Sequence, residues 1–370
     1  MKKVLALLLS LALCMTAFAA LAEDMRVAMI TDYGDITDQS FNQTTYEAAK
    51  AYCEANGVDF TYYKPAGDST AERVAMVEKA VDEDYNVLVL PGFAFGATVA
   101  EVQAEYPDTK FIALDVSAFD LKKENEDTPV DPASNVYCAV YQEELCGYMA
   151  GYAAVKLGYT HLGFLGGMAV PAVVRYGYGF VQGADAAAAE IGAAVEMNYA
   201  YGNQFYGDAD ITAAMDTWYG AGTQVVFACG GGIYSSAAEA AAKTGGKVIG
   251  VDVDQSGTID GQYGAGMTVT SAMKGLAPTV KTMLAAVQSG NFASMAGKVE
   301  NLGLVSANPD DNYVQLPSAT TQFGDGFTAE DYANLVADMF AGKITVSNDT
   351  SIAAADNAKV ITVNDQGNLK

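Results

Sequence analysis

Short apolar runs alternate with alanine-rich stretches along the whole chain from Arg26 onward. Runs of four to seven apolar residues bounded by turn residues predict buried strands, and the longer stretches between them have the length of helices. In the first third of the chain the predicted strands are RVAMI (26–30), DFTYY (59–63), NVLVLPG (86–92) and KFIALDV (110–116). The helices expected between them cover about 39–56, 71–81 and 96–105. This order predicts a parallel sheet with helices on both faces.

The same rhythm restarts after a polar, proline-containing loop over 118–135. The second set of predicted strands is VYCAVY, HLGFLGG, EMNYAYG, QVVFACGGG and KVIGVDVD, with helical stretches between them. We therefore predict an α/β protein with two doubly wound, Rossmann-like lobes joined by a hinge. The expected first lobe is 25–138 plus about 270–300, and the second is 139–269 plus about 303–345. The rest, 346–370, is expected to be a C-terminal extension. Crossings between lobes are expected near 137–141, 254–270 and 299–303.

Polar and glycine residues stand where several predicted strands end. Ligands bind at the carboxyl ends of parallel strands, and two facing lobes place these ends across a crevice. The strand-end candidates are Asp32, Gly92, Phe93, Asp115, Gly230, Gly231, Gly232 and Asp252. These residues are predicted to line a cleft.

Charge narrows the class of ligand and partner. The 370 residues carry 20 Lys and Arg against 45 Asp and Glu, a formal net charge of −25 at pH 7. A chain this acidic repels nucleic acid and anionic lipid and disfavours phosphorylated ligands. We expect a neutral or cationic small molecule and no nucleic-acid partner.

The N-terminus has the form of a secretory leader. Two lysines precede an apolar stretch from Val4 to Leu13, and small residues at Ala20 and Ala22 form a cleavage site before Glu23. This pattern predicts a signal peptide over 1–22 and an extracytoplasmic protein. The alternative is a lipoprotein leader with Cys14 as the lipidated residue. Bulky Leu13 before Cys14 favours simple secretion, and anchoring stays open.

Residues for catalysis or metal binding are scarce. The single histidine, His161, opens a predicted strand at the end away from the crevice, and no nucleophile, phosphate-loop or zinc-protease motif is present. The segment from Asp252 matches the first positions of a calcium loop but has Tyr263 where a bidentate Glu is needed. Cys53, Cys138, Cys146 and Cys229 are widely spaced and are expected to be buried free thiols. We expect no enzyme activity, cofactor or metal ion.

Aromatic residues near the strand ends suit a flat polar ligand. Phe41 lies one turn into the first predicted helix, and Phe205 with Tyr206 follows a strand of the second lobe. Aromatic rings from opposite lobes can enclose a flat base, with each stack contributing about 1 kcal/mol. A core position for Phe41, and helix-capping or turn roles for the acids, remain open at this point. Asp35 and Asp38 are expected to be solvated turn and capping residues.

Several segments resemble the basic membrane protein family. These are VAMITDYGDITDQSFNQTTYEA, GFLGGMAVPAVVRYGYGFVQGA, VVFACGGG, VIGVDVDQ and TVTSAMKG, and the similarity extends over about 26–290. Members of this family are substrate-binding proteins of ABC transporters that bind purine nucleosides. The resemblance implies the two-lobed architecture of type I periplasmic binding proteins and delivery of a nucleoside to membrane permease subunits by what we expect to be a monomer. Guanosine, inosine and adenosine remain open as ligands.

The resemblance also implies roles for particular residues. In the first lobe Phe41 matches an aromatic that stacks on the base, Asn42 a polar contact, and Asp32 an acid that contacts the base or ribose. In the second lobe Phe205 is similar to a second stacking aromatic, with Tyr206 as the alternative. Asp252 and Lys274 match an acid and a lysine that hold the ribose hydroxyls. Asp115 and the backbone amides of Gly92 and of Gly230 to Gly232 are weaker candidates.

Two other functional classes remain as alternatives. One is a sugar-modifying or hydrolase-like enzyme that uses pairs of Asp residues, against which the single histidine and missing nucleophile motif argue. The other is a secreted sensor, adhesin or binding module without transport, which binds a nucleoside or another small polar ring compound.

Overall fold

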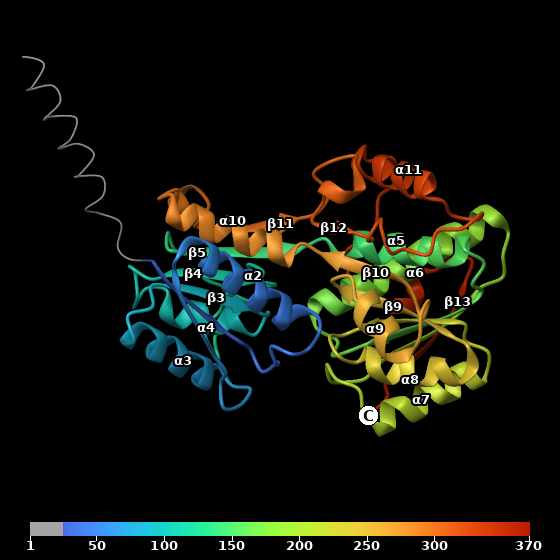
Figure 1. The fold of residues 1–370 in the computed structure, drawn as a ribbon, viewed down its shortest axis with the longest axis horizontal. Helices are drawn as coiled ribbons and strands as arrows, with labels where there is room; N and C mark the ends of the chain where they lie inside the picture. Colours follow the sequence, from blue (N-terminus) through green and yellow to red (C-terminus); the bar gives the residue numbers. More distant parts are fainter. Residues whose placement is uncertain (1–24) are drawn as a thin grey trace, which may run out of the picture.

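The computed structural model describes residues 25–370, and the predicted signal peptide and Cys14 lie outside the described residues. Figure 1 shows two lobes side by side; the first is drawn mainly in blue and teal, with α10 and β11 in orange, and the second in green to red. Each lobe is built on its own sheet, as the repeated rhythm predicts, and every strand pairing in the two sheets is parallel except that of β12 with β10. The predicted fold class is confirmed.

The first lobe contains a six-stranded sheet in the order β11-β5-β4-β3-β1-β2. Its strands are β1 (Arg26–Ile30), β2 (Asp59–Tyr63), β3 (Val87–Pro91), β4 (Lys110–Leu114), β5 (Val136–Tyr141) and β11 (Lys298–Leu302). Its helices are α2 (Phe41–Asn56), α3 (Thr70–Asp82), α4 (Phe95–Val102), α10 (Leu276–Gln288) and the short η1 (Phe292–Ser294). All five residues of β3 are buried, which explains its unbroken apolar sequence.

The second lobe contains a seven-stranded sheet in the order β12-β10-β9-β8-β6-β7-β13. Its strands are β6 (His161–Gly166), β7 (Glu196–Tyr201), β8 (Val225–Cys229), β9 (Lys247–Asp252), β10 (Thr268–Lys274), β12 (Val314–Gln315) and β13 (Thr362–Asn368). Its helices are α5 (Glu143–Lys156), α6 (Pro171–Ile191), α7 (Ala209–Gly220), α8 (Tyr234–Thr244), α9 (Ser256–Tyr263), α11 (Ala329–Phe340), η2 (Pro309–Asp311) and η3 (Ala354–Asn357). No helix within 25–370 is long and apolar enough to cross a membrane.

Two expected lobe boundaries need correction. β5 stays in the first sheet to Tyr141, so the boundary expected at 138 falls inside a strand. β10 pairs with β9 in the second sheet, so the crossing expected within 254–270 instead follows Lys274. The local pattern of β10 suits a strand of either sheet, and only its long-range pairing with β9 decides its place. We propose lobe boundaries at Gln142, at Gly275 and between Gly303 and Tyr313.

The three crossings lie against one another and form the hinge. The Gln142 amide donates to the Leu302 carbonyl at 3.0 Å, and the Tyr313 amide donates to the Gly303 carbonyl at 3.1 Å. The Gly275 amide donates to the Tyr313 carbonyl at 2.7 Å, which joins the remaining crossing to this group. The three crossings are therefore joined by backbone hydrogen bonds in one region between the lobes.

The C-terminal extension joins the second lobe. β13 adds a parallel strand beside β7 at the edge of the sheet. Before it, one carboxylate oxygen of buried Asp185 accepts hydrogen bonds from the amides of Lys359, Val360 and Ile361, at 2.6–3.1 Å. The extension is therefore an ordered part of the second lobe.

Helices α5 and α6 pack with their backbones almost in contact. Glycines at Gly147 and Gly151 of α5 and at Gly179 and Gly183 of α6 make this approach possible. A Cβ atom on Gly179 would lie 2.1 Å from the Glu144 carbonyl oxygen, far inside van der Waals contact. This close packing also sets the position of Glu143 in α5 relative to Arg175 in α6, which are paired at 2.7 Å.

Candidate functional site

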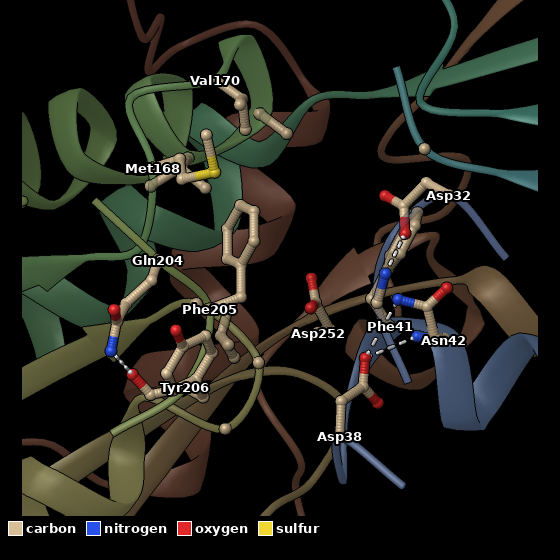
Figure 2. Close-up of a pocket in the computed structure, with 18 of the residues that line it drawn as sticks. Asp32, Asp38, Phe41, Asn42, Met168, Val170, Gln204, Phe205, Tyr206 and Asp252 are labelled. Carbon is tan, nitrogen blue, oxygen red and sulfur yellow. Dashed lines mark hydrogen bonds between the residues drawn. The ribbon is translucent and has the colours of Figure 1, made fainter. Parts of the chain in front are cut away.

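A cavity of about 710 Å³ lies between the two lobes at the carboxyl ends of their strands. Figure 2 shows Gln204, Phe205 and Tyr206 on one side, Asp32, Asp38 and Asn42 on the other, and Asp252 between them. All of the predicted site residues line this cavity: Asp32, Phe41, Asn42, Gly92, Phe93, Asp115, Phe205, Tyr206, Gly230, Gly231, Gly232, Asp252 and Lys274. The structure thus brings the strand-end candidates together, and their contacts with a ligand remain a proposal.

Asp32 ends β1 and holds the turn that follows it. Its Oδ1 accepts hydrogen bonds from the amides of Tyr33 at 2.7 Å and Gly34 at 2.8 Å. Burial raises the pKa of this carboxyl, and the two amide hydrogen bonds oppose that effect. Gly92 makes room on the other side, because a Cβ atom there would lie 2.6 Å from Asp32 Oδ2. Asp32 therefore shapes the cavity with one oxygen and presents the other towards Gly92.

Asp38 caps helix α2 and so positions Phe41 and Asn42 in its first turn. Its two carboxylate oxygens accept from the amides of Ser40, Asn42 and Gln43 at 2.9–3.0 Å. Asp38 thus satisfies amides at the start of the helix, as predicted, but Ser40 holds the N-cap position, and Asp38 is partly buried and lines the cavity, which the prediction of a solvated residue missed. The helix begins at Phe41 rather than at residue 39. Gln39 has φ of 56°, a left-handed conformation that excludes it from the helix. Asn42 is buried, and its Oδ1 has no hydrogen-bond partner.

Phe205 supplies an aromatic face from the second lobe. Its ring packs closely on the backbone at Gly167, where an added Cβ atom would lie 2.4 Å from the ring, and a Cβ atom on Gly230 would lie 3.3 Å from it. Tyr206 is 63% exposed and lies at the rim of the cavity, where it forms a bridge with Gly232. Of the two aromatics that the sequence left as alternatives, Phe205 is the one that packs into the cavity.

Lys274 lies at the centre of a buried charge cluster. Its Nζ is 2.6 Å from Asp115 of the first lobe, 3.5 Å from Glu143 and 3.6 Å from Asp252. Arg175 pairs with the second oxygen of Glu143 at 2.7 Å. We call Asp115, Glu143, Arg175, Asp252 and Lys274 the charge cluster. Glu143 and Arg175 were not among the predicted site residues, although Glu143 closely follows strand β5 and Arg175 lies within one of the segments that carry the family resemblance.

The charge cluster is surrounded by aromatic rings and joins the two lobes. The Lys274 ammonium lies 4.6 Å from the centre of the Phe41 ring, 5.5 Å from that of Tyr141 and 5.8 Å from that of Tyr176. Ser40 Oγ of the first lobe donates to Asp252 Oδ2 at 2.7 Å. The ammonium is therefore held by carboxylates and by cation–π contacts at once.

Burial and charge act in opposite directions on the pKa values in this cluster. Burial alone would lower the pKa of Lys274, but Asp115, Asp252 and Glu143 together raise it above its ordinary value. Burial raises the pKa of Asp115 to about 6, and the Lys274 ammonium offsets only part of that effect. Asp115 Oδ1 is buried without a hydrogen-bond partner, which leaves one acceptor of the cluster unused.

Because of this raised pKa, Asp115 is expected to make the protein less stable as the pH rises from about 4 to about 6. In this window folded Asp115 retains a proton that the unfolded chain has released, so raising the pH favours unfolding. A change in pKa from 3.8 to about 6 corresponds to about 3 kcal/mol. In Asp115→Asn this contribution should vanish, giving a smaller loss of unfolding free energy between pH 4 and pH 7 in urea titrations.

Asp35→Asn provides the control for this pH dependence. Lys64 lowers the pKa of Asp35, so removing that carboxyl should act on the pH dependence with the opposite sign. Equal pH dependence in Asp115→Asn and the parent protein would contradict the effect assigned to Asp115.

The residues considered for other chemistry lie elsewhere or have other partners. His161 is the exposed first residue of β6 and does not line the cavity, as expected from its strand position. In the calcium-like segment Asp254 accepts from the Ser256 amide, and Asp260 accepts from the amides of Gly266 and Thr268. Within 25–370 no group of three or more His, Cys, Asp or Glu residues is arranged to hold a metal ion.

Comparison with known proteins agrees with this geometry. A family model described as ABC transporter substrate-binding protein PnrA-like matches residues 25–317. The chain belongs to this family. It is thus an ABC transporter substrate-binding protein, and the resemblance to basic membrane proteins is confirmed.

Individual relatives of the family cover most of the chain. The ABC transporter nucleoside-binding protein BmpA of Lactococcus lactis subsp. cremoris is 27% identical over 340 residues, which is 87% of this chain and 89% of the relative. An uncharacterized lipoprotein of Pyrococcus abyssi is 29% identical over 51% of this chain and 45% of its own length. A solved ABC transporter solute-binding protein from Aeropyrum pernix K1 matches with a TM-score of 0.65 and 22% identity over 90% of each chain, which shows the shared fold.

Proposed function

We propose that this protein captures a purine nucleoside between its lobes outside the cytoplasm and delivers it to the permease subunits of an ABC importer. The observation that carries the proposal is the pairing, within one cavity, of an open Phe205 ring with a buried set of carboxylates around Lys274. The ring suits a flat base, and the carboxylates suit the hydroxyls of a ribose. The name of the Lactococcus relative, a nucleoside-binding protein, supports the same ligand class.

The base is proposed to lie against Phe205, with Phe41, Asp32 and Asn42 bordering it from the first lobe. Asn42 is buried with an unused acceptor oxygen, which suits a donor on the base edge. Stacking of a base on an aromatic side chain contributes about 1–3 kcal/mol, and a buried polar group left without a partner costs about 1–3 kcal/mol. Stacking thus supplies affinity, and the polar groups discriminate between bases.

The ribose is proposed to lie at the charge cluster. Asp252 and Asp115 present carboxylate oxygens there, and the Lys274 ammonium can donate to a ribose hydroxyl. Ser40 of the first lobe donates to Asp252 across the cleft, and a ribose hydroxyl is proposed to take the place of this donor. Backbone amides of Gly92 and of Gly230 to Gly232, and the Phe93 and Tyr206 side chains, are proposed to complete the boundary of the site.

The charge of the cavity favours a nucleoside over a nucleotide. Its lining includes Asp35, Asp38 and Asp68 in addition to Asp32, Asp115 and Asp252, against the two cations Lys64 and Lys274. A phosphate group is negatively charged and would be repelled by these carboxylates, which lowers the affinity for a nucleotide. Rotation of the lobes about the three adjacent crossings is proposed to close over the ligand and form the surface that the permease recognises.

Replacement of the two aromatics tests the proposed base contacts. Wild-type protein is expected to bind guanosine, inosine or adenosine in isothermal titration calorimetry, and to bind the matching 5′-monophosphates more weakly. Phe205→Ala is expected to weaken nucleoside binding 10-fold or more, in keeping with about 1–3 kcal/mol per stacked base. Phe41→Ala should also weaken binding, because it removes both a cavity side chain and the ring beneath Lys274.

Phe340→Ala is the matched control, because this phenylalanine is 49% exposed at the end of α11 and does not line the cavity. Its affinity should equal that of the wild type. Unchanged affinity in both Phe41→Ala and Phe205→Ala would rule out the stacking assignment. Absence of any nucleoside-dependent rise in melting temperature would rule out the ligand class, and release of free base or ribose would indicate an enzyme instead.

A further inference from the structure

Gln255 is a buried residue next to the cavity but outside its lining. It stands directly before helix α9 and is 1% exposed. A side-chain amide carries an acceptor oxygen and an amino group with two donor hydrogens. Because a buried polar group without a partner is costly, both ends of the amide need hydrogen bonds. The partners of Gln255 therefore show which parts of the molecule it joins.

Inside the second lobe, Gln255 holds the backbone beside two residues of the cavity. Its Oε1 accepts from the Val251 amide at 2.9 Å, at the end of β9 and directly before Asp252. Its Nε2 donates to the Gly231 carbonyl at 3.3 Å. Asp252 and Gly231 both have left-handed backbone, with φ of 65° and 53°. A residue such as Asp252 keeps this conformation only where surrounding contacts hold it, and Gln255 supplies one of them.

The same amino group also reaches the first lobe. Gln255 Nε2 donates to the Gln39 carbonyl at 3.1 Å. Close by, Thr258 Oγ1 in the first turn of α9 donates to Gln39 Oε1 at 3.1 Å. Gln39 lines the cavity and stands just before helix α2. These hydrogen bonds join the two lobes at the cavity, separately from the three crossings of the hinge.

The partners of Gln255 allow only one orientation of its amide. The Val251 amide can only donate, so it must face the oxygen, and the two carbonyls can only accept, so they must face the nitrogen. Gly250 makes room for this group, because a Cβ atom there would lie 2.9 Å from Gln255 Oε1. A side chain of the same size without the amide therefore retains the packing and loses all three hydrogen bonds.

We propose that Gln255 is a positioning residue that couples closure of the lobes to the shape of the ligand site. When the lobes meet, its amino group binds the first lobe at Gln39, while the same amide holds the backbone beside Asp252 and Gly231. Opening of the lobes breaks the bond to Gln39 and leaves the other two. The proposal rests on the proposed function only in the choice of a nucleoside as the test ligand, because the hydrogen bonds themselves involve no ligand.

Gln255→Met tests the effect of the amide on binding, because methionine is equally long and unbranched. In calorimetric titration with guanosine, inosine and adenosine, this variant is expected to bind about 10-fold more weakly than the wild type. The closed form loses its bond to Gln39, and the backbone beside Asp252 and Gly231 is no longer held. The melting temperature without ligand verifies that the variant folds.

Gln103→Met is the matched control. Gln103 is 6% exposed and does not line the cavity. Its side chain donates to the Asp131 carbonyl and accepts from the Ala133 amide, so both bonds lie within the first lobe. This variant also removes a buried amide and should lower the melting temperature, but its affinity should equal that of the wild type.

Distances between the lobes provide a readout that a merely structural role would not change. Nitroxide labels at Glu78→Cys in α3 and Ala213→Cys in α7 occupy exposed positions on helices that lie away from the crossings (Figure 1). The four cysteines within 25–370 are buried. In pulsed electron paramagnetic resonance without ligand, Gln255→Met should show more of the longer, open distances than the wild type. Thr258→Val, which loses one bond to Gln39, should shift the distances less, and Gln103→Met should not shift them.

Unchanged distances in both Gln255→Met and Thr258→Val would overturn the bridge between the lobes. Unchanged affinity in Gln255→Met would overturn the positioning of Asp252 and Gly231. Equal loss of affinity in Gln255→Met and Gln103→Met would overturn the coupling, because general destabilisation would then explain both. The distance measurement needs no nucleoside, so a wild-type protein that binds none would contradict the proposed function alone.

Discussion

Replacing Lys274 with methionine is expected to lower the free energy of unfolding by about 3–5 kcal/mol and to abolish nucleoside binding. The side chain of Lys274 is 3% exposed and is the nearest cation to Asp115 and Asp252. Methionine fills a similar volume but leaves these buried carboxylates without a counter-charge. Urea denaturation measures the loss of stability, and calorimetric titration measures the loss of binding.

Lys243→Met is the matched control for this substitution. Lys243 pairs with Asp216 at 2.8 Å, but its side chain is 48% exposed, so the pair is expected to contribute less than about 1 kcal/mol. Adding Asp115→Asn to Lys274→Met should recover part of the lost stability, because it removes one uncompensated carboxylate. A loss in Lys274→Met no greater than in Lys243→Met would show that the charge cluster does not depend on its lysine.

Gly179→Ala is expected to lower the free energy of unfolding by about 1–3 kcal/mol or more and to weaken nucleoside binding. The added Cβ atom would lie 2.1 Å from the Glu144 carbonyl oxygen and 2.7 Å from its carbonyl carbon. These are backbone atoms of the adjacent helix, which cannot turn aside as a side chain can. The clash is therefore relieved only by separating α5 from α6.

Separation of these helices would also disturb the site. α5 carries Glu143, and α6 carries Arg175 and Tyr176, all in contact with the charge cluster. Gly220→Ala is the control, because this last residue of α7 has no atom within 4 Å of an added Cβ, and alanine favours the helix. Gly220→Ala should retain full stability and affinity in the same urea and calorimetric measurements. If Gly179→Ala retained the same stability and affinity as Gly220→Ala, the close approach of α5 and α6 would contribute neither to the stability of the protein nor to binding.

The order of strands and helices could be predicted from the sequence, because each element depends on a local pattern of apolar and polar residues. Apolar runs such as the one in β3 predicted buried strands, and their alternation with helices predicted two parallel sheets. Since parallel strands place their carboxyl ends at one edge of a sheet, Asp32, Asp115 and Asp252 were predicted to line a cleft. The structure places all three around a single cavity. The aromatic pattern near the strand ends added Phe41 and Phe205, and the family resemblance added Lys274; all three line the cavity.

Contacts between residues far apart in sequence were decided only by the tertiary structure. The membership of β10 in the second sheet follows from its pairing with β9, and β13 joins the same sheet through β7. Gln255 meets Gln39 only because two lobes face each other. Arg175 of α6 reaches Glu143 of α5 where these two helices approach through glycines, and Glu143 in turn lies 3.5 Å from Lys274. The periodicity of apolar residues indicates which face of a helix or strand is buried. Which other element covers that face depends on how the whole chain packs, and this cannot be read from the local sequence.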